Sequence, residues 1–436
     1  MRKRKRVSPT IIQDSYVSGL RHLRRLSAVK SERAIEMLTP AANPGSHCPM
    51  HTTLSLAGRM AGVSTLVIGM PECGTYSKMV IPEPFGKQGE LHWAYLLDGN
   101  EVVFGCSKGL GEAIKEMDAA GAQAILLIVT CIPNLIAEDV ELLVQELEPQ
   151  LSTARLAVVQ AAHFTCSSHP PGFWRTLAAM GSLMDEGPDT GTARTINIMS
   201  FGPPRNAAGP ELEELLDGQG WQTRYLTPAS SLDEYLEAPK ASLNLVASPH
   251  FAELAAVMEK RFGIPAVQLH SAYSCADIGQ AYERIADILG IPQKDIASPA
   301  QEKLLRLEQE AEDCAKGVTF AITDGHLDPL PLAAYWTRLG LEPLLIHMEG
   351  FGQGDKAWGR TIVKSGHDPL ICHMANPETD AAVIAELSPG ICVGRPLAPR
   401  APGTVYLEGL SALAATCGYA RSIRMLESLC KAIQQE

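Results

Sequence analysis

The chain has 436 residues and a formal net charge of −12, with 46% hydrophobic and 20% charged residues. Because this length exceeds what one hydrophobic core usually supports, we expect two or three domains. The composition is typical of a globular protein and excludes a mainly disordered chain.

Charge is unevenly distributed along the chain. Residues 1–33 contain ten Lys and Arg but two acidic residues, which leaves 27 basic and 47 acidic residues in the rest. Since nucleic-acid binding requires clustered positive charge, the acidic body is not expected to bind it. The basic start is predicted to be a solvated tail that leads into an amphipathic helix with Tyr16, Leu20, Leu23 and Leu26 on one side. Contact with RNA, an acidic partner or an anionic surface is the alternative.

No segment has the pattern of a membrane span or an export signal. The longest apolar run, residues 124–129, is far shorter than the roughly 18 residues of a membrane span. Polar sequence follows the basic residues 2–6, where a secretory signal would have an apolar core. We therefore expect a cytoplasmic protein without membrane contact. Its eleven cysteines should stay reduced there, as ligands or as bystanders.

Apolar strands alternate with helical stretches in the manner of a parallel-sheet α/β protein. The first unit has predicted strands at residues 65–69, 101–105, 124–130 and 156–160. The second has strands at 195–202, 221–226, 243–247 and 265–269, and helices at 211–216, 252–262, 275–289 and 301–314. The third has strands at 317–323, 341–346, 369–373 and 390–394, and helices at 332–339, 379–387 and 409–433.

This pattern predicts an α/β fold of three Rossmann-like parallel-sheet domains around a central cleft. A Gly- and Asp-rich linker at residues 185–192 separates the first two domains. The expected divisions are a basic extension and helix at 1–34, a first domain at 35–185, a second at 190–300, a third at 315–400, and a C-terminal helical segment at 401–436.

Cys48, Cys73 and Cys131 each follow an apolar run or a Gly/Pro turn, at separations of 25 and 58 residues. Cys73 and Cys131 follow predicted strands, and ligands of open α/β sheets gather at the carboxyl ends of strands. Thiolates are the ligands that iron–sulfur clusters and zinc prefer. Three cysteine ligands are one fewer than a complete four-ligand site needs. The fourth ligand must come from elsewhere in the chain, from a second subunit or from outside the protein.

Motifs around these cysteines resemble the nitrogenase component 1 superfamily. Its members are the catalytic subunits of nitrogenase, cofactor-assembly scaffold subunits and dark-operative protochlorophyllide reductase subunits. Residues 67–77 resemble its Cys-Gly-x-Tyr-Ser element, and residues 129–139 its Thr-Cys element. Residues 103–105 are similar to its Val-Phe-Gly-Gly segment, with Cys106 in place of the second glycine. Asn244-Leu-Val246 and Phe262-Gly-Ile-Pro265 are similar to its second-domain pattern.

The resemblance implies that Cys48, Cys73 and Cys131 bind an iron–sulfur cluster, [4Fe–4S] or larger, at the interface between two homologous subunits. The missing ligand would come from the partner, a component 1-like subunit that is identical or paralogous. The resemblance also implies that a separate ATP-dependent iron–sulfur reductase protein donates electrons. A second metallocofactor or a tetrapyrrole as the acceptor stays open.

The resemblance is incomplete where the catalytic nitrogenase subunit binds its molybdenum–iron cofactor. That subunit has a cysteine just after Asn-Leu-Val, whereas this chain has Ser248. Its C-terminal cofactor histidine has no evident counterpart in residues 395–406. Because serine is a poor ligand for soft iron–sulfur chemistry, dinitrogen reduction at a bound molybdenum cofactor is not expected.

Other interpretations of the cysteines remain. All three can be buried small hydrophobes, or zinc ligands, although structural zinc sites favour short Cys-x-x-Cys pairs. Cys106 is the most plausible extra ligand from this chain, but we predict that it lines the same pocket without binding metal. Residues 105–111 match neither phosphate-loop fingerprint, so no ATP site is expected. The other cysteines are expected in the core: Cys166, Cys275, Cys314, Cys372, Cys392, Cys417 and Cys430.

Three histidines are the candidate catalytic residues. His163, His250 and His326 each follow a predicted strand, in more than one domain. We predict that they line a common interdomain cavity, as proton donors or as ligands for a substrate or cofactor. Each of them alone can also be an ordinary polar loop residue.

The leading hypothesis is an oligomeric, nitrogenase-like oxidoreductase subunit. It would hold the cluster at a subunit interface and relay electrons from the reductase protein to a substrate or cofactor in the interdomain cavity. The alternative is a scaffold subunit for assembly of a nitrogenase-type metallocofactor. A third, non-enzymatic interpretation is a three-domain binding protein with vestigial cysteines.

Overall fold

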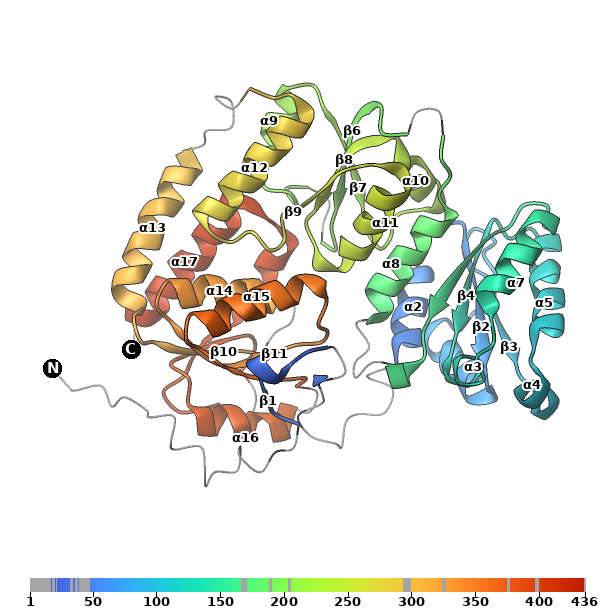
Figure 1. Cartoon of the computed structure of the whole chain (residues 1–436), viewed down its shortest axis with the longest axis horizontal. Helices are drawn as coiled ribbons and strands as arrows, with labels where there is room; N and C mark the ends of the chain where they lie inside the picture. The colour runs from blue at the N-terminus through green and yellow to red at the C-terminus, as the bar shows by residue number, and fades with distance from the viewer. Residues whose placement is uncertain are drawn as a thin grey trace. The chain divides into compact units, whose positions relative to one another are not determined.

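The computed structural model describes residues 17, 20, 22–31, 34–35, 38, 48–165, 171–187, 190–202, 205–292, 299–323, 327–374, 377–396 and 400–434. The chain divides into two compact units. The larger comprises Gly45–Leu305 and Ala414–Ile423, and the smaller comprises Met1–Pro44, Arg306–Leu413 and Arg424–Glu436. Three sheets, built almost entirely from parallel strands, confirm the predicted α/β fold (Figure 1).

The first sheet lies in the larger unit and has the order β3-β2-β4-β5. Its two central strands are buried along their whole length, as expected of a parallel sheet covered by helices on both faces. The strands are β2 (Val63–Gly69), β3 (His92–Leu96), β4 (Ala124–Val129) and β5 (Arg155–Gln160). The helices are α2 (Pro49–Ala57), α3 (Pro71–Val80), α4 (Gly99–Phe104), α5 (Ser107–Ala119), α6 (Cys131–Leu135), α7 (Val140–Leu147) and α8 (Pro171–Leu183).

The prediction of a strand at residues 101–105 is wrong, because these residues lie in helix α4 and its C-cap. Asp98 caps this helix: its side chain accepts hydrogen bonds from the amides of Asn100 and Glu101, and Glu101 bonds back to the Asp98 amide at 3.0 Å. This capping box overrides the strand preference of Val102 and Val103. The edge strand of the sheet is instead β3.

Asp118, on α5, anchors the loop that leads into β5. Its carboxylate accepts hydrogen bonds from the amides of Ser152, Thr153 and Ala154 at 2.8–2.9 Å. Burial opposes the charge of Asp118, but these hydrogen bonds outweigh it and lower its pKa to about 2. A lowered pKa stabilises the fold at pH values above the unfolded-state pKa of about 3.9, and the contribution is lost as the pH falls through about 2.

Asp118→Ala is expected to accelerate amide hydrogen exchange at residues 152–154 by roughly 10–100-fold at neutral pH. The reason is that a hydrogen bond to a charged group stabilises by about 1.5–3 kcal/mol. Exchange followed by mass spectrometry measures this effect. Glu116→Ala, an exposed position on the same helix, is the matched control. If amide exchange at residues 152–154 were unchanged in the Asp118 variant, the Asp118 hydrogen bonds would not stabilise this loop.

The second sheet, also in the larger unit, has the order β7-β6-β8-β9. Its strands are β6 (Ala193–Met199), β7 (Gln222–Leu226), β8 (Ala241–Val246) and β9 (Ala266–Gln268), and its helices are α9 (Pro210–Gly218), α10 (Leu232–Glu237), α11 (Ala252–Phe262) and α12 (Cys275–Leu289). One hydrophobic core joins the two sheets through α8, which contributes Leu177, Met180 and Leu183. The first and second sheets therefore share buried contacts.

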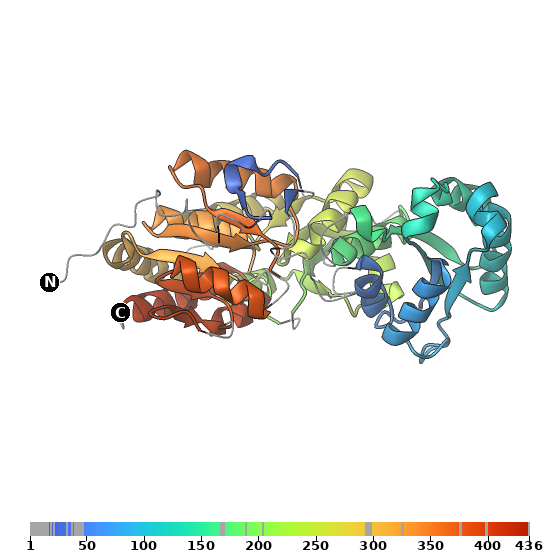
Figure 2. The ribbon, with the colours of Figure 1, turned by 90° about the horizontal axis from the view of Figure 1, so that it is seen from below.

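The third sheet lies in the smaller unit and has the order β1-β12-β11-β10-β13-β14. Its strands are β1 (Arg24–Arg25), β10 (Thr319–Ile322), β11 (Glu342–His347), β12 (Leu370–Cys372), β13 (Ile391–Val393) and β14 (Val405–Leu407). Helices α13 (Pro299–Ala315), α14 (Pro329–Arg338), α15 (Gln353–Lys364), α16 (Pro377–Leu387) and α17 (Gly418–Gln434) complete the chain. Figure 2 shows this sheet between α15 on one face and α16 on the other.

The N-terminal segment differs from the predicted amphipathic helix. Arg24 and Arg25 form β1, which pairs antiparallel with β12, and residues 26–28 form a short 3-10 helix. Tyr16 lies outside the described residues. Ser27 donates from its backbone amide to the Asp368 carboxylate at 2.9 Å. An unpaired edge of β12 and a nearby acidic partner thus stabilise extended backbone at residues whose spacing suits a helix.

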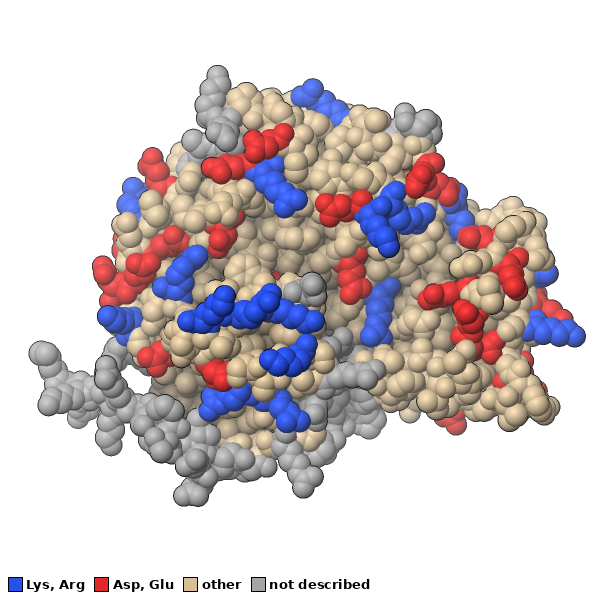
Figure 3. Space-filling view, viewed as in Figure 1, with Lys and Arg blue, Asp and Glu red and all other residues tan. Residues whose placement is uncertain are grey.

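Basic side chains gather on one face of the smaller unit. Arg24 and Arg25 are exposed, as are Lys356, Arg360 and Lys364 of α15. Figure 3 shows Lys and Arg concentrated over α15, whereas acidic residues are spread over the rest of this view. The positive charge of the N-terminal segment is therefore extended by a helix more than 300 residues away in the sequence.

Candidate metal centre

The three predicted ligand cysteines lie at helix starts in the first sheet's domain. Cys48 is the N-cap of α2, Cys73 lies in the first turn of α3, and Cys131 is the first residue of α6. Helices α3 and α6 follow β2 and β4, which are adjacent and parallel, with Ile68 opposite Val129. The two helices therefore begin at the same carboxyl edge of the sheet, as the sequence predicts.

The backbone of Gly69, at the end of β2, lies close to the side chains of Thr130, which follows β4, and Cys73. A Cβ atom on Gly69 would clash with the hydroxyl oxygen of Thr130 and would lie 3.0 Å from the sulfur of Cys73. The Thr130 hydroxyl donates to the carbonyl oxygen of Ile68 at 2.8 Å and lies 3.5 Å from the sulfur of Cys73. Only glycine leaves room for this arrangement.

The electrostatics of Cys48 show that the three sulfurs influence one another. Burial raises the pKa of Cys48, and the neighbouring Cys131 and Cys73 raise it further. Hydrogen bonds from the backbone of Met50 and His51 act in the opposite direction. Negative charge on Cys131 or Cys73 therefore disfavours the thiolate of Cys48, and a bound cation would favour it.

Buried apolar residues pack against two of the three cysteines. Cys48 and Cys73 pack against buried Met50, Leu54 and Val67, together with Ile128 and Ala161. Cys48, Cys73 and Cys131 are themselves half-buried. Cys48 and Cys73 thus lie on an apolar floor, and all three cysteine side chains are partly accessible.

His163 lies beside one of the cysteines. Its Nδ1 atom is 2.9 Å from the sulfur of Cys131. His163 begins a short 3-10 helix after β5, the strand next to β4 in the sheet. This candidate catalytic residue therefore belongs to the cysteine site.

His250 lies in a different environment, after β8 of the second sheet. Its Nδ1 atom is 3.1 Å from the Ser248 hydroxyl. The rings of Phe173, Trp174 and Phe201 surround its imidazole, with centroids 4.7–6.1 Å away. His326 lies outside the described residues. The common cavity that we predict for the three histidines therefore stays a prediction.

Cys106 is buried at the N-cap of α5. Its backbone amide donates to the Glu138 carboxylate at 3.0 Å. Burial and the adjacent Glu138 raise the pKa of the Cys106 thiol to about 12. The raised pKa favours the thiol form of Cys106, and its place in the pocket without metal stays a prediction.

The cysteines expected in the core have mixed surroundings. Cys275, Cys372, Cys392 and Cys417 are buried, whereas Cys314 and Cys430 are half-buried. Cys166 lies outside the described residues. The expectation is therefore wrong for Cys314 and Cys430 as regards complete burial.

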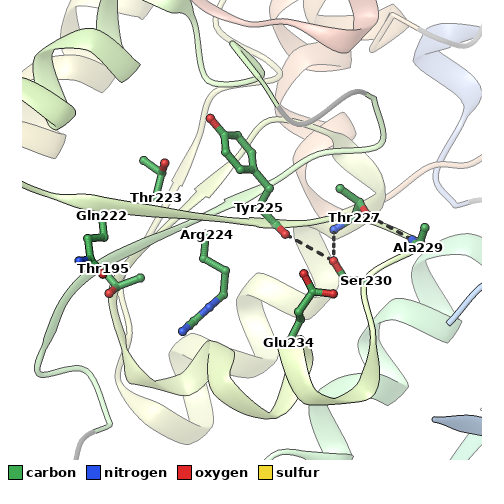
Figure 4. Close-up of a pocket in the computed structure, with 9 residues that line it drawn as sticks. All are labelled: Thr195, Gln222, Thr223, Arg224, Tyr225, Thr227, Ala229, Ser230 and Glu234. Atoms are coloured by element: carbon green, nitrogen blue, oxygen red, sulfur yellow. Dashed lines mark hydrogen bonds between the residues drawn. The ribbon is translucent and has the colours of Figure 1, made fainter. Parts of the chain in front are cut away.

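A pocket of about 590 Å³ lies beside β7, the edge strand of the second sheet (Figure 4). Polar side chains line it, among them Arg224, Tyr225 and Glu234. Arg224 is held by a hydrogen bond to the Glu237 carbonyl at 2.7 Å. None of the predicted site residues lines this pocket.

Sequence reasoning missed one further group, His347, Glu349 and His373, in the smaller unit. A signal for it was present, because His347 directly follows the predicted strand at 341–346 and His373 ends the predicted strand at 369–373. No helix among the described residues is long and apolar enough to cross a membrane.

The chain matches known proteins along most of its length. Residues 48–434 match the family described as nitrogenase component 1 type oxidoreductase. The chain is 30% identical over 319 residues to the nitrogenase iron-molybdenum cofactor biosynthesis protein NifE of Clostridium pasteurianum, and the match covers 68% of this chain and 67% of NifE.

Solved structures share the fold. Nitrogenase Cp1 at pH 6.5 has a TM-score of 0.62 and 13% identity, and the match covers 91% of this chain and 94% of that one. Nitrogenase Cp1 at pH 5 has a TM-score of 0.56 and 15% identity, with 93% and 91% covered. The family match and the NifE relative confirm the resemblance of the cysteine motifs: the chain belongs to the nitrogenase component 1 type oxidoreductase family.

Proposed function

We propose that this chain is a subunit that holds a [4Fe–4S] cluster through Cys48, Cys73 and Cys131. The observation that supports this most strongly is the placement of all three cysteines at helix starts in one domain, two of them at adjacent strand ends. Helix N-termini carry partial positive charge, which stabilises thiolates. The thiolate set suits iron–sulfur chemistry.

Three ligands leave one position for a neighbour. All three cysteines are half-buried, so a partner can reach the site and complete it. The partner proposed here is a homologous component 1-like subunit, identical or paralogous.

Exposed apolar side chains lie on three helices that follow strands of the first sheet. Met79 of α3 is 73% exposed, Val103 and Phe104 of α4 are 71% and 86% exposed, and Leu135 of α6 is 68% exposed. Large apolar groups at this exposure are typical of protein–protein interfaces. Helices α3, α4 and α6 all follow strands of the same sheet. We infer that this surface binds the partner subunit.

Phe104→Asp is expected to weaken association with the partner by about 10-fold or more, because it places a charge in an apolar contact. Size-exclusion chromatography with light scattering measures the assembly. Leu305→Asp changes an exposed apolar residue outside this sheet and is the control. An assembly that is equally stable in both variants would place the interface elsewhere.

The proposed activity is that of a nitrogenase-like oxidoreductase. A bound cluster supplies one-electron transfer, here from an ATP-dependent iron–sulfur reductase protein to a substrate or second cofactor. The residues of the chain hold the cluster, exclude water from its apolar floor and place it near the partner. His250, with its aromatic surroundings, remains the proposed cavity residue among the described histidines.

A scaffold role in metallocofactor assembly is the second candidate. The NifE relative favours it, because that protein is a nitrogenase iron-molybdenum cofactor biosynthesis protein. Ser248 is compatible with both roles. In a scaffold the same cysteines would support construction or transfer of a cofactor without substrate turnover.

The two roles are distinguished by electron counting. The complex of the chain with its partner is mixed anaerobically with the reductase protein and ATP, and electrons delivered per complex are measured over time. Repeated delivery beyond the capacity of the bound clusters supports the oxidoreductase. Delivery that stops after one filling, followed by transfer of a metal cluster to an acceptor protein, supports the scaffold.

His163→Ala is expected to weaken iron binding by about 10–100-fold, as is usual when a residue that supports a metal ligand is lost. It should also shift the EPR spectrum of the reduced cluster, because His163 lies 2.9 Å from the Cys131 sulfur. Iron analysis and EPR of anaerobic protein measure both effects. His250→Ala, a half-buried histidine outside the cysteine site, should retain iron and spectrum. Identical results for both variants would remove His163 from the site.

A further inference from the structure

Two histidines and a glutamate meet at the carboxyl edge of the third sheet. His347 is the last residue of β11, and His373 directly follows β12. These strands are adjacent and parallel, with His347 opposite Cys372. Glu349 lies two residues beyond His347. The fold therefore brings together three polar side chains from two strand ends within the smaller unit.

The spacing of these side chains suits a metal ion. One potential ligand atom from each residue lies within 4.8 Å of the other two. The Nε2 atom of His347 is 3.5 Å from a carboxylate oxygen of Glu349. Two ligands bonded at about 2.1 Å to a tetrahedral metal are about 3.4 Å apart, so this separation already matches. In the described part of the chain, no other trio of His, Cys, Asp or Glu is so close.

Burial distinguishes this group from ordinary surface charges. His347 is 4% exposed and His373 is 5% exposed, whereas Glu349 is half-buried. The two imidazole rings lie 5.1 Å apart, centroid to centroid, inclined at 37°. Met348, Ile346 and Ile371 are buried beside them. A bound cation would compensate two imidazoles and a carboxylate for their loss of water.

The donor set contains nitrogen and oxygen but no sulfur. Cys372 precedes His373, and successive side chains of a strand point to opposite faces. Cys372 packs in the core with Val383 and Ile384 of α16. Two imidazoles and one carboxylate suit zinc or ferrous iron, with at least one coordination position left open.

We propose that His347, Glu349 and His373 form a binding site for one divalent transition metal ion, zinc or ferrous iron, separate from the cysteine site. The open position would take water or a ligand of the metal. This site does not depend on the function proposed above, because its residues lie in another sheet and another unit from the three cysteines.

One backbone hydrogen bond to His347 must break when a metal ion binds. The Met374 amide donates to Nδ1 of His347 at 2.9 Å, so a neutral His347 carries its proton on Nε2, which faces Glu349. For Nε2 to bind the metal, the proton on Nε2 must move to Nδ1. The hydrogen bond from the Met374 amide to Nδ1 must then break. The loss of one neutral hydrogen bond is small beside three metal–ligand bonds. Hydrogen exchange at the Met374 amide should therefore become faster when the metal binds.

The test uses the full chain, treated anaerobically with a chelator and titrated with Co²⁺, followed by competition with Zn²⁺. In the variant in which Cys48, Cys73 and Cys131 are all changed to serine, we expect one Co²⁺ site per chain with visible ligand-field absorption and no thiolate-to-cobalt charge transfer. In the wild type, sulfur charge transfer reports Co²⁺ at the cysteines and is counted separately. Absence of Co²⁺ binding in the serine variant, or sulfur charge transfer from it, would overturn the proposal.

Variants of the three ligands make the test specific. His347→Ala and His373→Ala should weaken Co²⁺ binding by about 100-fold and Glu349→Gln by about 10-fold, by analogy with the loss of metal-supporting residues. His367→Ala and Glu342→Gln change the same residue types in the same unit and should bind as the wild type does. Wild-type affinity in His347→Ala or His373→Ala would contradict the assignment.

Folding of the variants is checked by the melting temperature without metal. If the alanine variants unfold, His347→Gln and His373→Gln replace them, because glutamine keeps a polar side chain of similar size. In the background in which Cys48, Cys73 and Cys131 are serine, Zn²⁺ should raise the melting temperature of the otherwise unchanged chain and of His367→Ala, but not that of the glutamine variants. An equal rise in the glutamine variants, or a slower Met374 amide in the zinc-loaded wild type, would refute the assigned ligands.

Discussion

Cys73→Ser is expected to abolish stoichiometric iron binding to the complex of this chain with its partner. Cys73 lies between the β2 end and Thr130, above an apolar floor, so no other described thiol can take its place. Serine keeps the shape but loses the soft thiolate that iron–sulfur clusters require. Iron and acid-labile sulfide analysis after anaerobic purification, with EPR after dithionite reduction, measures the loss.

Cys314→Ser is the matched control for this experiment. Cys314 is also half-buried, but it lies on α13 and its thiol is directed to the Ala311 carbonyl at 3.6 Å. Iron content and EPR spectrum should be unchanged in this variant. A complex that contains no iron in the wild type, or that keeps its spectrum in Cys73→Ser, would end the cluster hypothesis.

Arg421→Ala is expected to destabilise the larger unit by about 3 kcal/mol or more. Arg421 is 2% exposed and donates to the carbonyl oxygens of His270 and Ala272 at 2.9 and 2.6 Å. Its guanidinium also lies 4.1 Å from the ring centroid of Tyr273. Alanine would leave buried carbonyl groups without a donor, at about 1–3 kcal/mol each, and would create a cavity.

The melting temperature of the full chain measures this effect. A loss of that size should lower it by about 6–12 °C in a unit of this length. Arg424→Ala removes the same side chain from the same helix at an exposed position and should change the melting temperature by less than about 2 °C. Equal shifts in the two variants would show that the buried hydrogen bonds of Arg421 contribute little.

Strand positions could be predicted wherever the apolar run is continuous. Residues 124–129 are buried at every position in β4, and a parallel strand covered on both faces requires that pattern. The prediction was wrong at residues 101–105 because an Asp98 side chain decides the conformation there, and apolar composition does not describe capping. β1 could not be predicted either, since its partner, β12, lies more than 340 residues away.

The candidate site was partly accessible to sequence reasoning. The strand-end positions of Cys73 and Cys131 follow from the two apolar runs before them, and the structure places both where we expect. The contact between His163 and Cys131 could not be predicted, because it depends on the conformation of the turn after β5. His347 and His373 also stand at strand ends, but their proximity depends on strand order, which the sequence pattern leaves open.

The short strand β1 connects the basic N-terminal segment to the metal-site candidate. Arg24 and Arg25 pair with Ile371 and Leu370, and the Leu38 amide donates to the His373 carbonyl at 2.8 Å. The N-terminal segment therefore forms backbone hydrogen bonds both along β12 and just after its end. A partner that displaced residues 24–38 would therefore break backbone hydrogen bonds of β12 and of His373, one of the proposed metal ligands.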